Sequence, residues 1–229
     1  MEEFERNFSI KCDSILDKTS FSVNENETMI KLISDIIKIT EIALKTLPNS
    51  KRKKLNSLKH IYISQKRLCS LSVYIDFFII DLMIALKHLC LNESNLEKAY
   101  FIKQAYASIS EFIVRIKDND SDLIKDDINK LGKTVFHYYE NMISELESFS
   151  VTDSFRTMEL VRNKIANHYD ADVQLYIKLL KELAELKAVK EITNVFFFVK
   201  SCREFNDELM KILSEEVEKN NFRLKEINA

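Results

Sequence analysis

The sequence predicts an all-α protein, most simply an antiparallel helical bundle with long helices. The chain of 229 residues contains one glycine, Gly132, and one proline, Pro48, whereas average usage would give about 16 and 11. The dipeptides Asn-Gly and Asp-Gly, which tight β-hairpins prefer, do not occur, and no segment alternates apolar and polar residues over a strand length. A content of 46% hydrophobic and 31% charged residues is too apolar for a disordered chain.

The N-terminal 23 residues show no clear period, and we expect them to form a poorly patterned lead-in. Residues 24–229 are then expected to form a single all-helical domain. Asn24 and Glu27 have the spacing of a capping box, so a first helix is predicted over about 25–47, ended by Pro48. Asn49 or Ser50 can cap the next segment, which runs unbroken to Leu91 as one long helix or two abutting ones.

Polar clusters divide the rest of the chain. Ser94 with Glu97 forms a capping box that opens a helix to about residue 117. Another helix is predicted over 122–148, possibly bent at Gly132, and Thr152 or Asp153 caps one that reaches about residue 167. Apolar residues at steps of three and four predict a tail helix over 172–219, and its segment 195–199 is expected in the core, with a partner contact as the alternative.

The composition also excludes several classes of function. One glycine cannot form a Gly-rich phosphate loop, a dinucleotide-binding fingerprint or a nucleophile elbow. The four cysteines have no zinc-knuckle spacing and are expected to be reduced thiols, and the Glu-x-x-His pattern of di-iron bundles is absent. We therefore expect no metal and no cofactor.

The chain is expected to act in the cytoplasm, away from the membrane. The segment Met1–Arg6 is acidic and does not resemble a secretory signal. The most apolar region, 74–91, is interrupted by Asp76, Asp81 and Lys87, so no membrane span is predicted.

The segment 158–170, Met-Glu-Leu-Val-Arg-Asn-Lys-Ile-Ala-Asn-His-Tyr-Asp, is the most informative part of the sequence. It resembles the Arg-Asn…His signature of the HEPN superfamily, particularly its abortive-infection branch, in which a helix ends in Arg-Asn-x-x-Ala-His-x-Asp. The residues that match this pattern are Arg162, Asn163, Ala166, His168 and Asp170. Asn167 is a departure, because it widens the gap between arginine and histidine by one residue.

The resemblance implies a HEPN-like bundle and a metal-independent endoribonuclease of a toxin or antiviral abortive-infection system. Arg162, His168 and Asn163 are the expected catalytic residues, supported by Tyr169 and Asp170. Histidine can act as acid or base near neutral pH, and arginine offers a permanent planar fork for phosphate oxygens. The resemblance further implies a homodimer in which two motifs form one composite site. A neutralising antitoxin or another defence protein is a further expected partner.

Helix geometry favours a break between the two principal residues. In a continuous helix Arg162 and His168 would lie about 120° apart around the axis, so they could not share a face. A helix that ends near residue 166 or 167 leaves His168 free to turn back. A polar residue from an earlier helix often supports the HEPN site, and either Asp76 or Asp81 could take that place.

A second candidate surface lies in the segment 42–75, which contains eight Lys or Arg residues and no acid. Arg52, Lys59 and Lys66 recur every seven residues, which places them along one side of a helix, and we expect them to bind RNA phosphates. The alternative is a solvated face that is balanced by acidic neighbours in the fold.

A rival to the enzyme is a non-catalytic helical module that retains the fold and binds RNA or a protein. In that case Arg162 pairs with Glu159, and His168 only interacts with the helix dipole.

Overall fold

The computed structural model describes residues 2–91, 94–119, 122–163, 191–192 and 194–228. The elements in these ranges are the helices α1 (Glu2–Thr46), α2 (Asn49–Leu91), α3 (Asn95–Asn119), α4 (Asp122–Leu131), α5 (Lys133–Ser150), α6 (Asp153–Val161) and α9 (Phe196–Asn228). No strand occurs within them. The predicted all-α fold is confirmed.

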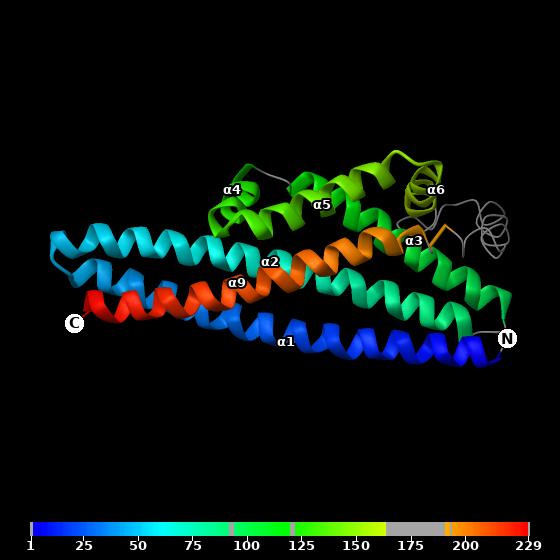
Figure 1. Ribbon diagram of the computed structural model, residues 1–229, viewed down its shortest axis with the longest axis horizontal. Helices are drawn as coiled ribbons and strands as arrows, with labels where there is room; N and C mark the ends of the chain where they lie inside the picture. The colour runs from blue at the N-terminus through cyan, green and yellow to red at the C-terminus, as the bar shows by residue number, and fades with distance from the viewer. Residues whose placement is uncertain (1, 92–93, 120–121, 164–190, 193, 229) are drawn as a thin grey trace.

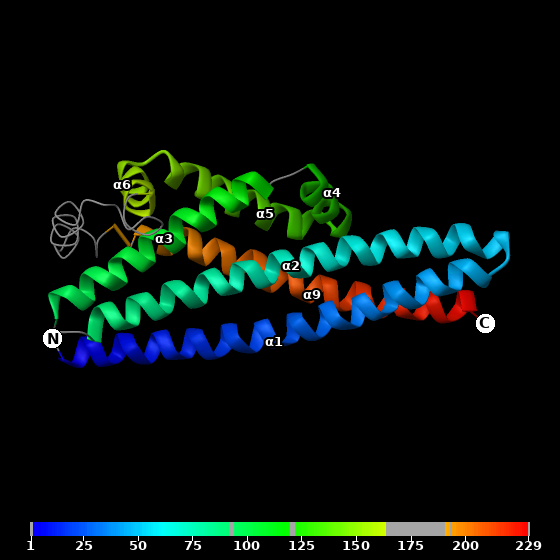
Figure 2. The same ribbon diagram turned by 180° about the vertical axis from the view of Figure 1, so that it is seen from behind.

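Helices α1 and α2 form the long axis of the molecule. They are joined by the turn at Pro48 and lie side by side (Figures 1 and 2). Ion pairs tie them together at both ends: Lys59 Nζ lies 2.7 Å from Glu41 Oε1, and Lys87 Nζ lies 2.5 Å from Asp13 Oδ1. Of the two possibilities left open for the segment from Asn49 to Leu91, one long helix is observed, and the predicted end of α1 before Pro48 is confirmed.

The expectation of a poorly patterned lead-in over residues 1–23 was wrong, because α1 begins at Glu2 and runs without a break to Thr46. Cys12, Thr19 and Val23 are buried in the N-terminal half of this helix, with Asn26 in register after them. The Thr19 hydroxyl donates to the Ile15 carbonyl at 2.8 Å, which satisfies it within the helix. The helical period is hard to recognise from the sequence because small and polar residues occupy buried positions that are usually aliphatic.

Helices α3 to α6 follow α2 and fold back over it. In both views α4, α5 and α6 lie on the side of α2 and α9 that is remote from α1 (Figures 1 and 2). Two predicted N-caps are present: the Glu97 amide donates to Ser94 Oγ at 3.5 Å, and the Phe155 amide donates to Thr152 Oγ1 at 3.2 Å. The capping box predicted at Asn24 and Glu27 was wrong, because both residues lie inside α1.

Gly132 breaks the helix predicted over 122–148 into α4 and α5 instead of bending it. Its backbone angles, φ 136° and ψ 164°, lie in a region that is accessible almost only to glycine. A Cβ added here would meet no atom within 4 Å. The glycine is therefore required by the backbone conformation and not by a shortage of space.

Helix α9 returns along the α1–α2 pair, and its C-terminal end lies near the turn at Pro48 (Figure 1). The predicted core positions are buried, and they include Val199, Cys202, Leu209, Leu213 and Val217. The helix continues to Asn228, nine residues past its expected end, whereas residues 172–190 of the predicted tail helix lie outside the described residues. In the segment 195–199, Val195, Phe198 and Val199 are buried while Phe197 is exposed, so its main role is core packing.

A buried polar cluster joins α1, α2 and α9 at Asp76. The carboxylate is 3% exposed and accepts hydrogen bonds from Ser22 Oγ at 2.7 Å, Asn26 Nδ2 at 3.3 Å and Asn206 Nδ2 at 2.8 Å. Asn26 Nδ2 also lies 2.9 Å from Ser72 Oγ. Burial raises the pKa of Asp76 to about 6, although these hydrogen bonds act in the opposite direction.

Among the described helices, α2 alone contains a stretch that is long and apolar enough to cross a membrane by length and composition. Within that stretch 61% of the residues are buried against the rest of the protein. Its apolar character therefore matches that of a core helix.

Candidate functional site at Arg162

Arg162 follows directly on α6, a short helix that is held at both ends. Thr152 caps its N-terminus, and Phe155, Met158 and Val161 bury one side of it. The Arg162 amide continues the helical hydrogen bonding to the carbonyls of Met158 and Glu159. Because α6 packs against α3, the Arg162 side chain extends toward α3.

The Arg162 guanidinium is largely enclosed yet incompletely bonded. Its side chain is 22% exposed, and Nη1 lies 3.4 Å from Ser110 Oγ and 3.8 Å from Glu111 Oε2. Nε is buried and has no hydrogen-bond partner in the described part of the chain. A pairing with the Glu159 side chain, the sequence-based alternative, is not observed, and Glu111 of α3 takes that position instead.

A second guanidinium lies on the same segment of α3. Arg115 Nε lies 2.5 Å from Glu111 Oε1, so Glu111 is placed between two arginines. The guanidinium carbon of Arg115 lies 5.9 Å from the centre of the Tyr74 ring, a cation–π arrangement. Burial, the largest cause, raises the pKa of Tyr74 to about 12.

These groups line a cavity of about 510 Å³ between α2 and α3, called here the Arg162 cavity and defined by Tyr74, Phe77, Asp81, Glu111, Arg115 and Arg162. Phe77 is 47% exposed. Burial raises the pKa of Asp81. Of the two aspartates left open by the sequence, Asp81 shares a cavity with Arg162, whereas Asp76 belongs to the separate polar cluster.

The remainder of the motif is only partly described. Asn163 is exposed and follows Arg162 at the edge of the described segment. His168, Tyr169 and Asp170 lie outside the described residues, so whether they approach Arg162 stays a prediction.

The predicted basic stripe on α2 does not form one free face. Lys59 is half-buried and pairs with Glu41, which lowers the pKa of that carboxyl by a hydrogen bond and by its charge. Lys66 is also half-buried. Arg52 is exposed, and its Nε donates to the Leu47 carbonyl at 2.8 Å. The expected role of the three residues in RNA binding stays a prediction. The alternative was a solvated face balanced by acidic neighbours, and Lys59 does have such a neighbour in Glu41.

Sequence reasoning did not single out Glu111, Arg115 or Ser110. Glu111 and Arg115 have the i, i+4 spacing of ordinary surface ion pairs, so the pattern alone gives no reason to select them. Their proximity to Arg162 depends on the packing of α6 on α3, which brings together residues about 50 positions apart.

Comparisons of the chain with protein-family models, with curated proteins and with solved structures give no match. Within the described ranges, no group of three or more His, Cys, Asp or Glu side chains is placed to hold a metal ion. The Arg162 cavity instead combines two guanidinium groups with aromatic walls, which suits an anion attached to a flat ring.

Proposed function

We propose that this protein is a metal-independent endoribonuclease with an antiparallel, HEPN-like bundle, acting in the cytoplasm as a toxin or abortive-infection effector. The observation that supports the proposal is the incomplete hydrogen bonding of the Arg162 guanidinium. An arginine with a purely structural role is normally satisfied by its neighbours, but here, among the described residues, Nε is buried without a hydrogen-bond partner and the Nη1 contacts are long. A phosphate oxygen in the cavity would supply the missing acceptor.

The proposed chemistry needs no group beyond protein side chains. The ribose 2′-oxygen attacks phosphorus as its proton passes to a base, and the bond from phosphorus to the 5′-oxygen breaks as an acid protonates the leaving oxygen. His168 is the proton-transfer residue, and Arg162 stabilises the charge on the phosphorane, with Asn163 orienting either group. Tyr169 and Asp170 support His168.

The cleavage reaction needs two proton transfers, one to a base and one from an acid, and this requirement favours a homodimer. The motif offers one histidine for each chain, and a two-fold axis near Arg162 would supply the second without any further sequence. We expect light scattering of the purified protein to give twice the 26.9 kDa of one chain. A monomer at the concentration of the cleavage assay would contradict the composite site.

Cleavage of total RNA by the purified protein is expected to persist in an excess of a chelator. A DNA oligonucleotide is expected to stay intact, because it lacks the 2′-hydroxyl that acts as nucleophile. The measurement is gel analysis of both substrates, matched in sequence, with and without chelator. Loss of RNA cleavage on chelation, or equal cleavage of the DNA, would contradict the proposed reaction.

A non-catalytic RNA- or protein-binding module is the second candidate, and one observation favours it. Glu111 lies 3.8 Å from Arg162 and also pairs with Arg115, so it partly neutralises the two charges that a substrate phosphate would need. RNA binding without cleavage by the wild-type protein would support this alternative.

A further inference from the structure

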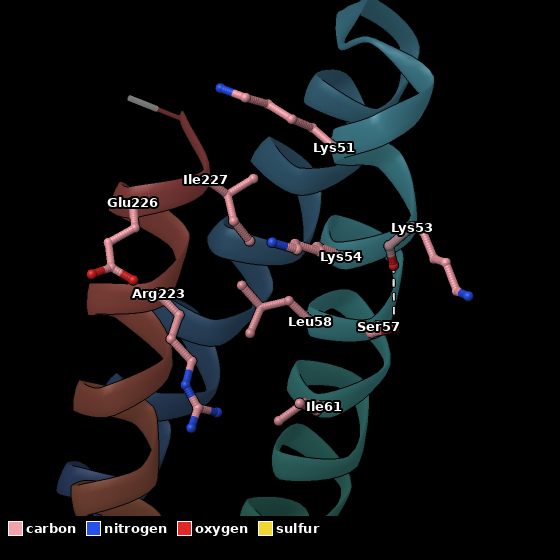
Figure 3. A pocket seen from close by; sticks show the side chains of 9 residues that line it. All are labelled: Lys51, Lys53, Lys54, Ser57, Leu58, Ile61, Arg223, Glu226 and Ile227. Atoms are coloured by element: carbon pink, nitrogen blue, oxygen red, sulfur yellow. Dashed lines mark hydrogen bonds between the residues drawn. The ribbon is translucent and has the colours of Figure 1, made fainter.

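A second cavity lies at the opposite end of α2, where its first turns meet the end of α9. Its volume is about 720 Å³, and it is named here the tip cleft, defined by Lys51, Lys54, Leu58, Ile61, Arg223 and Ile227. Figure 3 shows the Lys51 and Lys54 side chains extending from α2 toward α9, with Arg223 on the facing helix. Leu58, Ile61 and Ile227 provide apolar surface between the cations.

The part of the chain that the structure describes places no carboxylate in an ion pair with the cations of the tip cleft. Among the described residues none of Lys51, Lys54 and Arg223 takes part in an ion pair with an acid, although Arg223 Nη1 lies 3.2 Å from Asn220 Oδ1. Of the described residues that line the cleft, Glu226 is acidic, and its carboxylate points away from α2 in Figure 3. This differs from Lys59, further along α2, which pairs with Glu41.

Helix stability does not account for this clustering. The first turns of a helix carry partial positive charge, which favours acidic residues, but the first turn of α2 has none. Lys51 and Lys54 therefore oppose the helix dipole and repel each other. Such an arrangement becomes favourable when an anion occupies the cleft.

We propose that the tip cleft binds the phosphate groups of single-stranded RNA. This inference rests on the proposed function, since it assigns part of the contact with the same substrate. Flexible ammonium groups neutralise successive phosphates without a requirement for sequence, and the apolar surface between them can contact bases. An acidic amphipathic helix fits less well, because it would need apolar anchors over several turns, and the cleft offers only three apolar side chains.

The test is equilibrium binding of a fluorescent oligouridylate to the full chain at several salt concentrations. All proteins carry His168→Ala, so that the RNA stays intact and binding is measured separately from cleavage. The cleft variant adds Lys51→Gln, Lys54→Gln and Arg223→Gln. The matched control instead adds Lys38→Gln, Lys130→Gln and Lys200→Gln, three lysines whose side chains are 72%, 73% and 78% exposed and pair with nearby acids.

The cleft variant is expected to bind RNA at least about tenfold more weakly at 0.1 M salt, with a log–log salt slope smaller by about 2, since each phosphate contact contributes about 0.7 for a single strand. The control should bind like the parent, and Lys54→Gln alone should give an intermediate affinity. Equal affinity of the cleft variant and the control would overturn the proposal. The proposal would also be overturned if the cleft variant lost as much affinity for a polyglutamate peptide as for RNA, because that would indicate a protein partner. Because every protein in this test carries His168→Ala, the binding result does not depend on whether the wild-type protein cleaves RNA.

Discussion

Replacing Arg162 with alanine is expected to lower the rate of RNA cleavage by a factor of about 10²–10³, the usual effect of removing one group that stabilises transition-state charge. The fold should survive, because the side chain makes only contacts at 3.4 Å and 3.8 Å to α3 and leaves Nε unbonded in the described structure. His168→Ala should reduce cleavage by about 10²–10⁴, the range for a general acid or base. The measurement is single-turnover cleavage of a labelled RNA, with circular dichroism to check helicity.

The matched control is Arg156→Ala. Arg156 lies on α6, is 72% exposed and pairs with Asp153, so its removal should leave cleavage unchanged. Arg162→Lys retains the charge but loses the planar fork, and we expect its activity to lie between those of alanine and wild type. Wild-type rates for both Arg162→Ala and His168→Ala would remove the proposed active site.

Replacing Asp76 with asparagine is expected to stabilise the protein at pH 7.5 by up to about 3 kcal/mol. The pKa of this carboxyl rises from 3.8 to about 6 on folding, and about 1.4 kcal/mol corresponds to each pH unit. The folded state thus retains the proton at pH values where the unfolded chain releases it. In the wild-type protein, the stabilisation that comes from this proton is complete below pH 3.8 and is lost as the pH rises through 6. Urea unfolding at several pH values measures this effect.

Asparagine fits the polar cluster because Asn26 Oδ1 and Asn206 Oδ1 are buried without a described partner and can accept from a new amide. Asp76→Leu leaves the surrounding donors unsatisfied and should instead destabilise the fold by about 3 kcal/mol or more. Asp35→Asn, at an exposed ion pair on α1, serves as the control and should change stability by less than about 1 kcal/mol. An unchanged pH profile in Asp76→Asn would show that this carboxyl does not titrate as expected.

Local signals made most of the helical fold predictable. Pro48, Ser94 and Thr152 mark helix boundaries through their own backbone or side-chain chemistry, so their effect can be read from adjacent residues. The N-terminal half of α1 was missed because Thr19 and Asn26 occupy buried positions, and their burial depends on partners in distant helices. Gly132 was expected to bend a helix, but a glycine also permits a full break, and only tertiary packing decides between them.

The candidate site was predictable only in part. Arg162 was identified because it belongs to a contiguous motif. Glu111 and Arg115 reach it through the contact of α6 with α3, and no local pattern encodes that contact. The same limit applies to the tip cleft, where Lys51 and Lys54 meet Arg223 from the far end of the chain. The absence of acids from the segment 42–75 indicated phosphate binding, but helix packing determines which of its cations are left to contact a phosphate.

The length of α2 has a consequence for the size of the proposed RNA substrate. Leu58 of the tip cleft and Phe77 of the Arg162 cavity are 19 residues apart on this one helix, a rise of about 28 Å. A strand that keeps its bases stacked advances about 3.4 Å for each nucleotide, so about eight stacked nucleotides span the distance between the two surfaces. A shorter fragment that keeps its bases stacked can contact one surface but not both. Under the proposed function, this one helix fixes the spacing between the two RNA-binding surfaces, and short cleavage products that contact one surface would be held less tightly than the intact strand.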